Sequence, residues 1–363
     1  MKMVFRWFGE GNDSVSLQHI KQIPAVEGIV WALHDIKVGE VWPLERIQMM
    51  KEQADTYHLH LDVVESVNIH ESIKLGLDTR DMYIDNYIET LKNLAKIGVK
   101  VVCYNFMPVF DWVRTELFRS HPDQSTAMFY EKAKVDQMNP IELVNRIASN
   151  KTFTMPGWEL DRLETLKELF LAYKYVSEND LRDNLHYFLE RVIPVCESLD
   201  IKLAIHPDDP PWSIFGLPRI VTTGENLEKI TKLVDSPYNG ITFCSGALGV
   251  NPKNDLIDII HKCKERIHFA HIRNVLLFEN GDFIETSHLT RDGSLPIDEV
   301  MKALSDCNFT GYMRPDHGRH IWGEECRPGY GLYDRALGIM YLHGLWDGYQ
   351  LKKKEEASYV TNS

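Results

Sequence analysis

The sequence lacks the features that indicate a secreted, membrane-spanning or nucleotide-binding protein. Its first residues, MKMVFRWFGEGND, contain no apolar region long enough for a signal peptide, and no run in the chain approaches the roughly 18 apolar residues of a membrane helix. No GxGxxG or GxxxxGK(S/T) motif follows the first expected strand. We therefore expect a cytoplasmic protein that has no membrane partner and no nucleotide-binding loop.

The chain also has fewer basic than acidic residues, and few cysteines. Lys and Arg number 40 against 53 Asp and Glu, which gives a formal net charge of −13. Because a protein that follows a nucleic-acid backbone needs a surplus of positive charge, we expect no nucleic-acid partner. The six cysteines in 363 residues form no CxxC pair, so we expect buried thiols in a reducing compartment rather than disulfides.

Short apolar runs rich in β-branched residues alternate with helical patterns along most of the chain. Continuous apolar strands separated by helices are typical of a parallel sheet that is covered on its outer face. Eight such repeats fit a closed (β/α)8 TIM barrel better than an open sheet, so we predict an α/β barrel in a single domain over residues 1–350. The eight expected strands cover residues 3–9, 28–33, 61–66, 99–106, 201–207, 240–246, 267–274 and 311–315.

The regular spacing breaks once, between the fourth and fifth expected strands. The segment that separates them is far longer than one barrel helix requires. We predict a helical insertion at about residues 111–180 on the fourth βα loop, followed by the fourth barrel helix. A loop in this place lies on the C-terminal face of a barrel, where it can cover the site or contact another subunit. The last residues, 351–363, are polar and are expected to form a loose tail.

Residues that commonly bind metals stand at the ends of four consecutive expected strands. His206, Cys244 and His271 end the fifth, sixth and seventh strands, and Asp316 follows the eighth. The carboxyl ends of barrel strands lie on one face, so these side chains should meet there. Imidazole, thiolate and carboxylate groups all bind first-row divalent cations. The pattern predicts a metal site, and ligand softness leaves both zinc and manganese or magnesium open.

Other polar or aromatic residues lie where a substrate could reach the same face. Arg273 is a candidate because arginine binds carboxylates in a bidentate manner, and His288 because it lies in the polar loop ETSHLTRDGS. Glu65 ends the third strand and Asn105 lies near the end of the fourth. Trp7 in the first strand could form an apolar wall of the site. For Trp7, a role in core packing is an equal alternative. For Glu65, the alternative is a structural hydrogen bond.

Several motifs together resemble one known family. RWFG, VVCYNFMPVFDW, LAIHPDDPPWSIFGLPRI, TFCSGALG, FAHIRNV and MRPDHGR, followed by PGYGLYDRALGIMYLHGL, look like the D-mannonate dehydratases of the UxuA type, and the likeness runs nearly end to end. The resemblance implies a xylose-isomerase-like TIM barrel. It also implies a metal-dependent hydro-lyase that converts D-mannonate to 2-keto-3-deoxy-D-gluconate in hexuronate and glucuronate breakdown.

The same resemblance assigns roles to residues. His206, Cys244, His271 and Asp316 match the metal ligands of the family, whose usual metal is manganese, with Fe²⁺ or Co²⁺ as alternatives. The proton-transfer residues of the family lie in the segment that holds His317 and Tyr330. We take His317 and Tyr330 as the candidates. Asp316 could also take part in proton transfer in addition to binding the metal, and Tyr333 is the alternative to Tyr330. We also expect a homo-oligomer, a dimer.

Three alternatives remain open at this stage. An aldose-ketose isomerase would use a similar metal centre, and an assay of D-mannonate for 2-keto acid separates it from a dehydratase. A metal-dependent barrel endonuclease conflicts with the net charge of −13. A binding protein with a purely structural metal would close the metal site with protein ligands alone.

Overall fold

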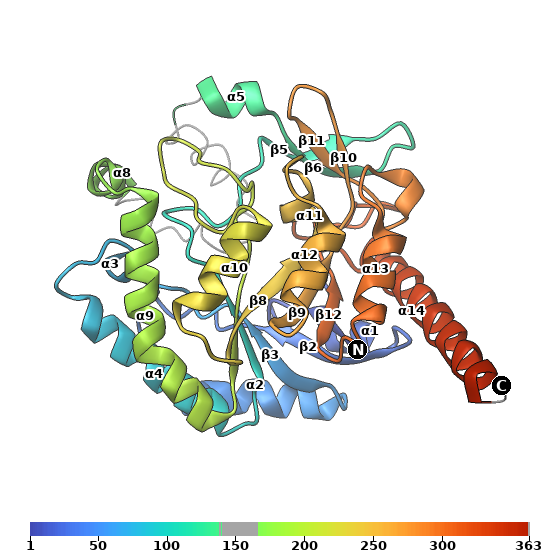
Figure 1. Ribbon diagram of the computed structural model, residues 1–363, viewed down its shortest axis with the longest axis horizontal. Helices are drawn as coiled ribbons and strands as arrows, with labels where there is room; N and C mark the ends of the chain where they lie inside the picture. Colours follow the sequence, from blue (N-terminus) through green and yellow to red (C-terminus); the bar gives the residue numbers. More distant parts are fainter. Residues whose placement is uncertain (138, 140–165, 362–363) are drawn as a thin grey trace.

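The computed structural model describes residues 1–137, 139 and 166–361, and it shows a closed barrel of eight parallel strands (Figure 1). The strands follow one another around the barrel in the order β1, β12, β9, β8, β7, β4, β3 and β2. All eight runs expected from the sequence form these strands, which confirms the predicted (β/α)8 fold. The barrel strands are β1 (Lys2–Arg6), β2 (Val26–Trp31), β3 (His60–Glu65), β4 (Val101–Tyr104), β7 (Lys202–Ile205), β8 (Asn239–Cys244), β9 (Ile267–Ile272) and β12 (Tyr312–Pro315).

Helices surround the barrel and cover the outer faces of its strands (Figure 1). The fourth barrel helix, α9 (Glu178–Leu199), begins with a capping box in which the side chains of Ser177 and Asp180 each accept a hydrogen bond from the other residue's backbone N–H. The other described helices are α1 (Leu17–Lys21), α2 (Leu44–Thr56), α3 (Glu71–Lys74), α4 (Arg80–Ala95), α5 (Lys132–Gln137), α8 (Leu166–Tyr173), α10 (Gly224–Leu233), α11 (Ser245–Gly249), α12 (Leu256–Cys263), α13 (Ile297–Asp306), α14 (Leu332–Thr361) and the 3-10 turn η1 (Thr290–Asp292).

A second, four-stranded antiparallel sheet lies at the end of the barrel to which the strands point (Figure 1). It joins β5 (Glu116–Ser120) and β6 (Thr126–Tyr130) from the insertion to β10 (Val275–Leu277) and β11 (Phe283–Glu285). The prediction of a helical insertion was therefore wrong for residues 116–130, which form a hairpin, and right for α5 and α8. The rest of the insertion, residue 138 and residues 140–165, lies outside the described residues.

The C-terminal segment also differs from the expectation. Residues 351–361 continue helix α14, which runs away from the barrel, so they are not a loose tail (Figure 1). The physical reason is composition: the sequence LKKKEEA consists of strong helix formers, and it extends a helix that already exists. Among the described residues, no helix combines the length and the apolar character needed to cross a membrane.

The barrel interior is filled by a layer of apolar side chains. Successive side chains of a strand point to opposite faces, so each strand sends every second residue inward. The residues of this layer pack against one another and are at most 6% exposed. They are Val4, Val30, Val63, Val101, Cys103, Ala204, Phe269 and Tyr312. This layer closes the barrel below the site, so the polar residues that follow on each strand face only the mouth.

Candidate metal centre and active site

A polar layer lies directly above the apolar one. Each of its members comes two residues after an inward-facing residue of the same strand, so it points the same way. Its members are Arg6, Glu65, His206, Cys244, His271 and Arg314. The parallel register sets Cys244 beside His271, and His271 beside Arg314. The barrel therefore gathers residues from six strands at one level.

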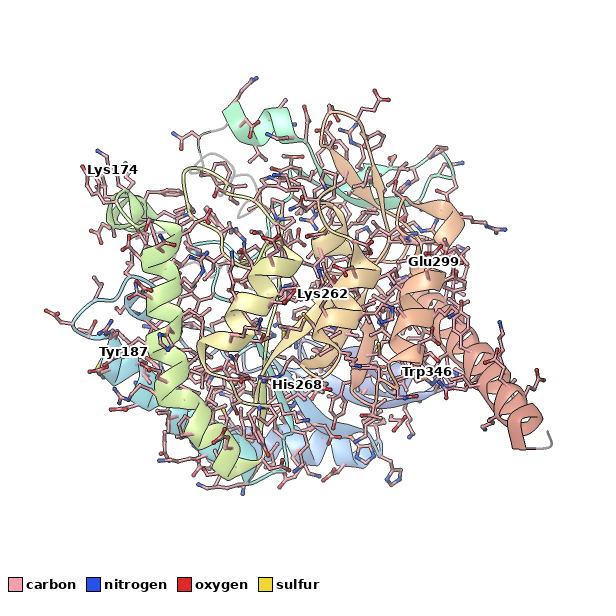
Figure 2. The ribbon with its side chains drawn as sticks, in the orientation of Figure 1. Lys174, Tyr187, Lys262, His268, Glu299 and Trp346 are labelled. Carbon is pink, nitrogen blue, oxygen red and sulfur yellow. The ribbon has the colours of Figure 1, made fainter. Side chains whose placement is uncertain are left out.

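Three of the four expected metal ligands converge in this layer. Nε2 of His206 lies 3.1 Å from Nδ1 of His271, and potential ligand atoms of His206, Cys244 and His271 all lie within 4.8 Å of one another. His271 and Cys244 are fully buried. Position along the strand matters here, since His268 of the same strand lies near the opposite end of the barrel (Figure 2).

Asp316, which directly follows β12, contacts one member of this group. Its Oδ2 atom lies 3.5 Å from Sγ of Cys244, while its Oδ1 atom accepts a hydrogen bond of 2.9 Å from Arg314. Burial raises the pKa of Asp316, but His317, Arg314 and Arg273 outweigh burial and hold the pKa well below its ordinary value. Asp316 is therefore a carboxylate, which is the state that binds cations.

The protonation pattern of the group fits a divalent metal. Nδ1 of His206 lies 2.7 Å from the carbonyl oxygen of Pro207, which accepts its proton and leaves Nε2 as the free donor atom. Burial lowers the pKa of His271 to about 3, so its imidazole is neutral; its Nε2 lies 3.3 Å from Oε2 of Glu65, and its Nδ1 faces Nε2 of His206. Burial raises the pKa of Cys244, and a bound cation would replace the thiol proton.

The expected proton-transfer residues lie beside this group. Nε2 of His317 is 3.0 Å from the hydroxyl oxygen of Tyr330, and the ring of Trp112 meets that of His317 edge to face. His317, Tyr330 and Trp112 face a cavity of about 580 Å³. This volume includes space that is open to solvent. The cavity is lined by Arg6, Glu65, Ser66, Cys103, Tyr104, Asn105, Met107, Asp111, Trp112, His206, Asp209, Arg314, Asp316, His317 and Tyr330.

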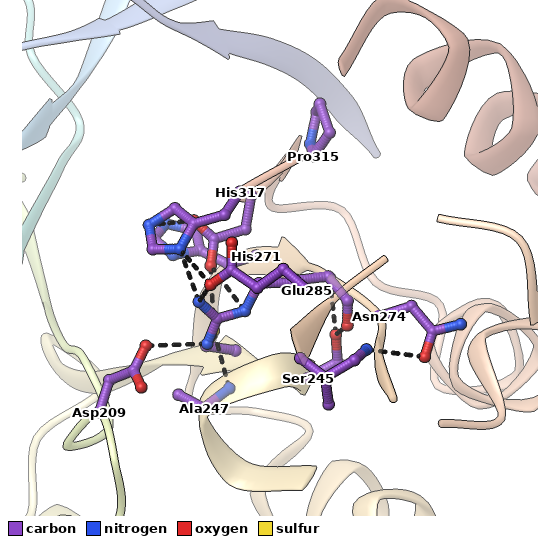
Figure 3. Close-up of polar contacts among 12 residues, drawn as sticks. Asp209, Ser245, Ala247, His271, Asn274, Glu285, Pro315 and His317 are labelled. Atoms are coloured by element: carbon purple, nitrogen blue, oxygen red, sulfur yellow. Dashed lines mark hydrogen bonds and ion pairs between the residues drawn. The ribbon is translucent and has the colours of Figure 1, made fainter. Parts of the chain in front are cut away.

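A buried ion network contacts Nδ1 of His317 (Figure 3), whereas Nε2 of the same ring faces Tyr330. Nδ1 of His317 contacts Arg273 at 2.7 Å and Glu285 at 2.9 Å. Arg273 also binds Asp209 and Glu285, and Arg114 forms a bidentate pair with Asp209 and a further contact with Glu285. Burial raises the pKa of Glu285, but His317 and the two arginines outweigh it and lower the pKa below the ordinary value. The two arginines and two carboxylates of this network thus hold the imidazole of His317 in one orientation.

The structure brings two of the five expected substrate-binding residues to the cavity. Glu65 and Asn105 line it. The other three lie elsewhere: Trp7 packs in the core and donates its indole N–H to Val15, Arg273 is fully buried behind His317, and His288 is buried without lining the cavity. Arg273 contacts Nδ1 of His317 instead of lining the cavity.

Several residues of the site were not singled out from the sequence. Arg6 and Arg314 could have been found, because each lies two positions beyond an inward-facing strand residue. Asp209 is the second aspartate of the HPDDPP motif, whose sequence alone does not distinguish it from Asp208. Glu285 is the last residue of β11 and Arg114 lies just before β5, so their meeting depends on the pairing of β6 with β11, which has no local signal in the sequence.

The fold defines the class as a (β/α)8 TIM barrel with a polar layer at its mouth. A xylose isomerase-like TIM barrel protein from Mycobacterium smegmatis, solved in complex with magnesium, matches with a TM-score of 0.53 over 92% of this chain and 88% of that one. Its sequence identity of 12% shows the fold alone.

Sequence comparison narrows the class to one family. The family model for D-mannonate dehydratase (UxuA) matches residues 1–356. Mannonate dehydratase 1 of Halalkalibacterium halodurans is 67% identical over 350 residues, which cover 96% of this chain and 97% of the relative. The crystal structure of mannonate dehydratase from Streptococcus suis serotype2 is 42% identical with a TM-score of 0.88, covering 97% of this chain and 96% of that one. The chain belongs to the D-mannonate dehydratase family and is a hydro-lyase.

Proposed function

We propose that the chain removes water from D-mannonate to give 2-keto-3-deoxy-D-gluconate, in the breakdown of hexuronates such as glucuronate. The observation that carries this proposal is that His317 and Tyr330 line one cavity together with His206 and Asp316, and that Cys244 and His271 lie beside His206. The test is an assay of the Mn²⁺-loaded protein with D-mannonate. Formation of a 2-keto acid is expected, and a product that retains the C3 hydroxyl group, or no product at all, would contradict the proposal.

We assign the metal to His206, Cys244, His271 and Asp316. This donor set of two imidazoles, one thiolate and one carboxylate suits a first-row divalent cation. We propose Mn²⁺ as the metal from the family resemblance, with Fe²⁺ and Co²⁺ as alternatives. When bound, the cation supplies Lewis acidity that stabilises negative charge on the carboxylate end of the substrate.

The side chains of His317 and Tyr330 carry the two proton transfers in this proposal. Burial raises the pKa of Tyr330, so its hydroxyl keeps its proton and can give it to the departing C3 hydroxyl group. His317 takes the C2 proton, with its imidazole held by Arg273 and Glu285. The C2–H and C3–O bonds break, water leaves, and the resulting enol takes up a proton at C3 as it becomes the 2-keto acid.

Arg6 is the residue that we assign to the anionic end of the substrate. Of the two arginines that line the cavity, Arg314 already binds Glu65 and Asp316. Arg6 instead donates to the carbonyl oxygen of Val30 and contacts the ring of His34, and no carboxylate of the described residues lies within ion-pair distance of it. A buried guanidinium without an anion favours binding of a carboxylate.

We also propose that the protein forms a homodimer in the cytoplasm. Exposed apolar side chains gather on one face of α14 at helical spacing, at Tyr333, Leu337 and Met340, and Trp322 lies exposed beside them. An apolar face of this kind is typical of an interface between two copies of a chain.

A further inference from the structure

The carboxylate of Glu65 has both of its oxygens engaged, although it lines the cavity. Arg314 donates to Oε1 at 2.8 Å and to Oε2 at 3.1 Å. A guanidinium that binds a carboxylate through two hydrogen bonds favours the charged form of that carboxylate. A charged carboxylate that is already bound by arginine on both oxygens has little capacity left for a substrate hydroxyl.

The contact of Glu65 with His271 suggests a different role. Oε2 of Glu65 lies 3.3 Å from Nε2 of His271, whereas Nδ1 of His271 faces His206 on the other side of the ring. A neutral imidazole that uses Nδ1 as a metal ligand carries its proton on Nε2. Pro207 accepts the corresponding proton of His206. Each metal-binding imidazole thus has an acceptor at its outer nitrogen.

Arg314 connects this acceptor to a second ligand. Its guanidinium donates to Glu65 through Nε and one amino group, and to Oδ1 of Asp316 through the other amino group at 2.9 Å. This bond leaves Oδ2 of Asp316 directed toward Cys244 at 3.5 Å. One planar side chain therefore fixes two carboxylates from opposite ends of the chain, a geometry that lysine cannot reproduce.

We propose that Glu65 and Arg314 are positioning residues of the metal centre. Glu65 accepts the Nε2 proton of His271, and Arg314 holds Glu65 and Asp316 at fixed places around the metal position. Partners of this kind set the orientation and basicity of metal ligands, and their loss typically weakens metal binding by about 10- to 100-fold. The inference rests on the ligand set given under the proposed function.

A second metal ion is the competing interpretation of these residues. Ligand atoms of Glu65, Cys103 and His271 also lie within 4.8 Å of one another. Two observations favour positioning: the Arg314 guanidinium already neutralises Glu65, and burial raises the pKa of Cys103, whose sulfur accepts a hydrogen bond from Thr242 at 3.2 Å. A second metal ion at this place would have to displace the Arg314 guanidinium from Glu65 and remove the proton of the buried Cys103 thiol.

The test is the affinity of the metal-free protein for Mn²⁺, measured by competition with a chelating dye. Glu65→Gln keeps the shape of the side chain, and Arg314→Lys keeps the charge. We expect both variants to bind Mn²⁺ about 10- to 100-fold more weakly than the wild type, with one equivalent bound per wild-type chain. The matched control is Asp334→Asn, because Asp334 is a buried carboxylate paired with Arg319 that contacts no metal ligand. Its Mn²⁺ affinity should stay within twofold of the wild type.

Circular dichroism of the metal-free variants separates weakened binding from loss of the fold. An affinity of folded Glu65→Gln within twofold of the wild type would overturn the proposal, as would a wild-type chain that binds two Mn²⁺ ions or none. An unchanged affinity with a raised KM for D-mannonate would make Glu65 a substrate-binding residue instead. The proposed function fails separately, if the Mn²⁺-loaded wild type forms no 2-keto acid from D-mannonate.

Discussion

Nε2 of His317 lies 3.0 Å from the hydroxyl oxygen of Tyr330, and both side chains are at most 5% exposed although they line the cavity. Proton transfer by positioned groups typically contributes 10² to 10⁴ to a rate. We therefore expect His317→Asn and Tyr330→Phe each to lower kcat on D-mannonate by about 10²- to 10⁴-fold, with metal content unchanged. Tyr333→Phe is the control, because Tyr333 is exposed and does not line the cavity. A large loss of kcat in Tyr333→Phe would assign the proton-transfer role to Tyr333 instead.

Metal binding should stabilise the fold as well as support activity. A ligand that binds only the folded state at 100 times its Kd adds about 2.7 kcal/mol to the free energy of unfolding. We expect this gain when Mn²⁺ is added to the metal-free wild type and not when it is added to Cys244→Ala. Chelator titration followed by thermal unfolding measures it. Cys263→Ala, at a buried cysteine on α12, should keep the full gain. Equal stabilisation of Cys244→Ala would exclude this thiol from the ligands.

Arg6 should contribute to substrate binding and not to metal binding. Hydrogen bonds to a charged group contribute about 1.5–3 kcal/mol, which corresponds to roughly 10- to 100-fold in KM. Arg6→Lys should raise the KM for D-mannonate by about this factor and leave Mn²⁺ affinity unchanged. Steady-state kinetics at saturating Mn²⁺ tests the prediction. The control, Arg46→Lys, alters an exposed ion pair with Asp35 and should leave KM as it is. An unchanged KM in Arg6→Lys would place the substrate carboxylate elsewhere.

The buried network behind His317 should be costly to break. Glu285→Gln removes the anion that Arg114 and Arg273 share, and the loss of one partner from a buried ion pair typically costs about 3–5 kcal/mol. Urea unfolding should show this loss. Glu116→Gln, in an exposed pair with Arg119, should cost less than about 1 kcal/mol. A comparably small loss in Glu285→Gln would mean that Asp209 alone balances both arginines.

The exposed face of α14 gives a test of the proposed dimer. Leu337→Glu and Met340→Glu place charges in the centre of this face. Together they should convert a dimer to a monomer in size-exclusion chromatography with light scattering. Leu351→Glu, at an exposed position nearer the C-terminal end of the same helix, is the control and should leave the mass unchanged. A double variant of unchanged mass would place the interface on another surface.

The barrel could be predicted because its signals are local. Each β-branched run fills one strand, and the period of two along a strand fixes which residues face inward. His206, Cys244 and His271 were found for this reason, since each ends a run and faces the mouth. The same rule, applied to every strand, would also have given Arg6 and Arg314.

The second sheet could be predicted only in part. The hairpin of β10 and β11 has a local signal, the Asn280-Gly281 pair between apolar runs, and the run TAMFY of β6 has strand composition. Pairing of β6 with β11 has no local signal, because it joins two different loops of the barrel. Arg114 and Glu285 meet across 171 residues of sequence through this pairing. The ion network that buries Arg273 depends on the same pairing and could not be predicted. Arg273 was therefore expected to contact the substrate.

The central claim is that the protein removes the C2 proton and the C3 hydroxyl group of D-mannonate. The most direct measurement is an NMR spectrum of the product formed by the Mn²⁺-loaded protein in D₂O. The account predicts 2-keto-3-deoxy-D-gluconate that carries one deuterium at C3, because the enol takes its proton from solvent. A product that retains the C3 hydroxyl group, or no product with Mn²⁺ bound, would contradict it.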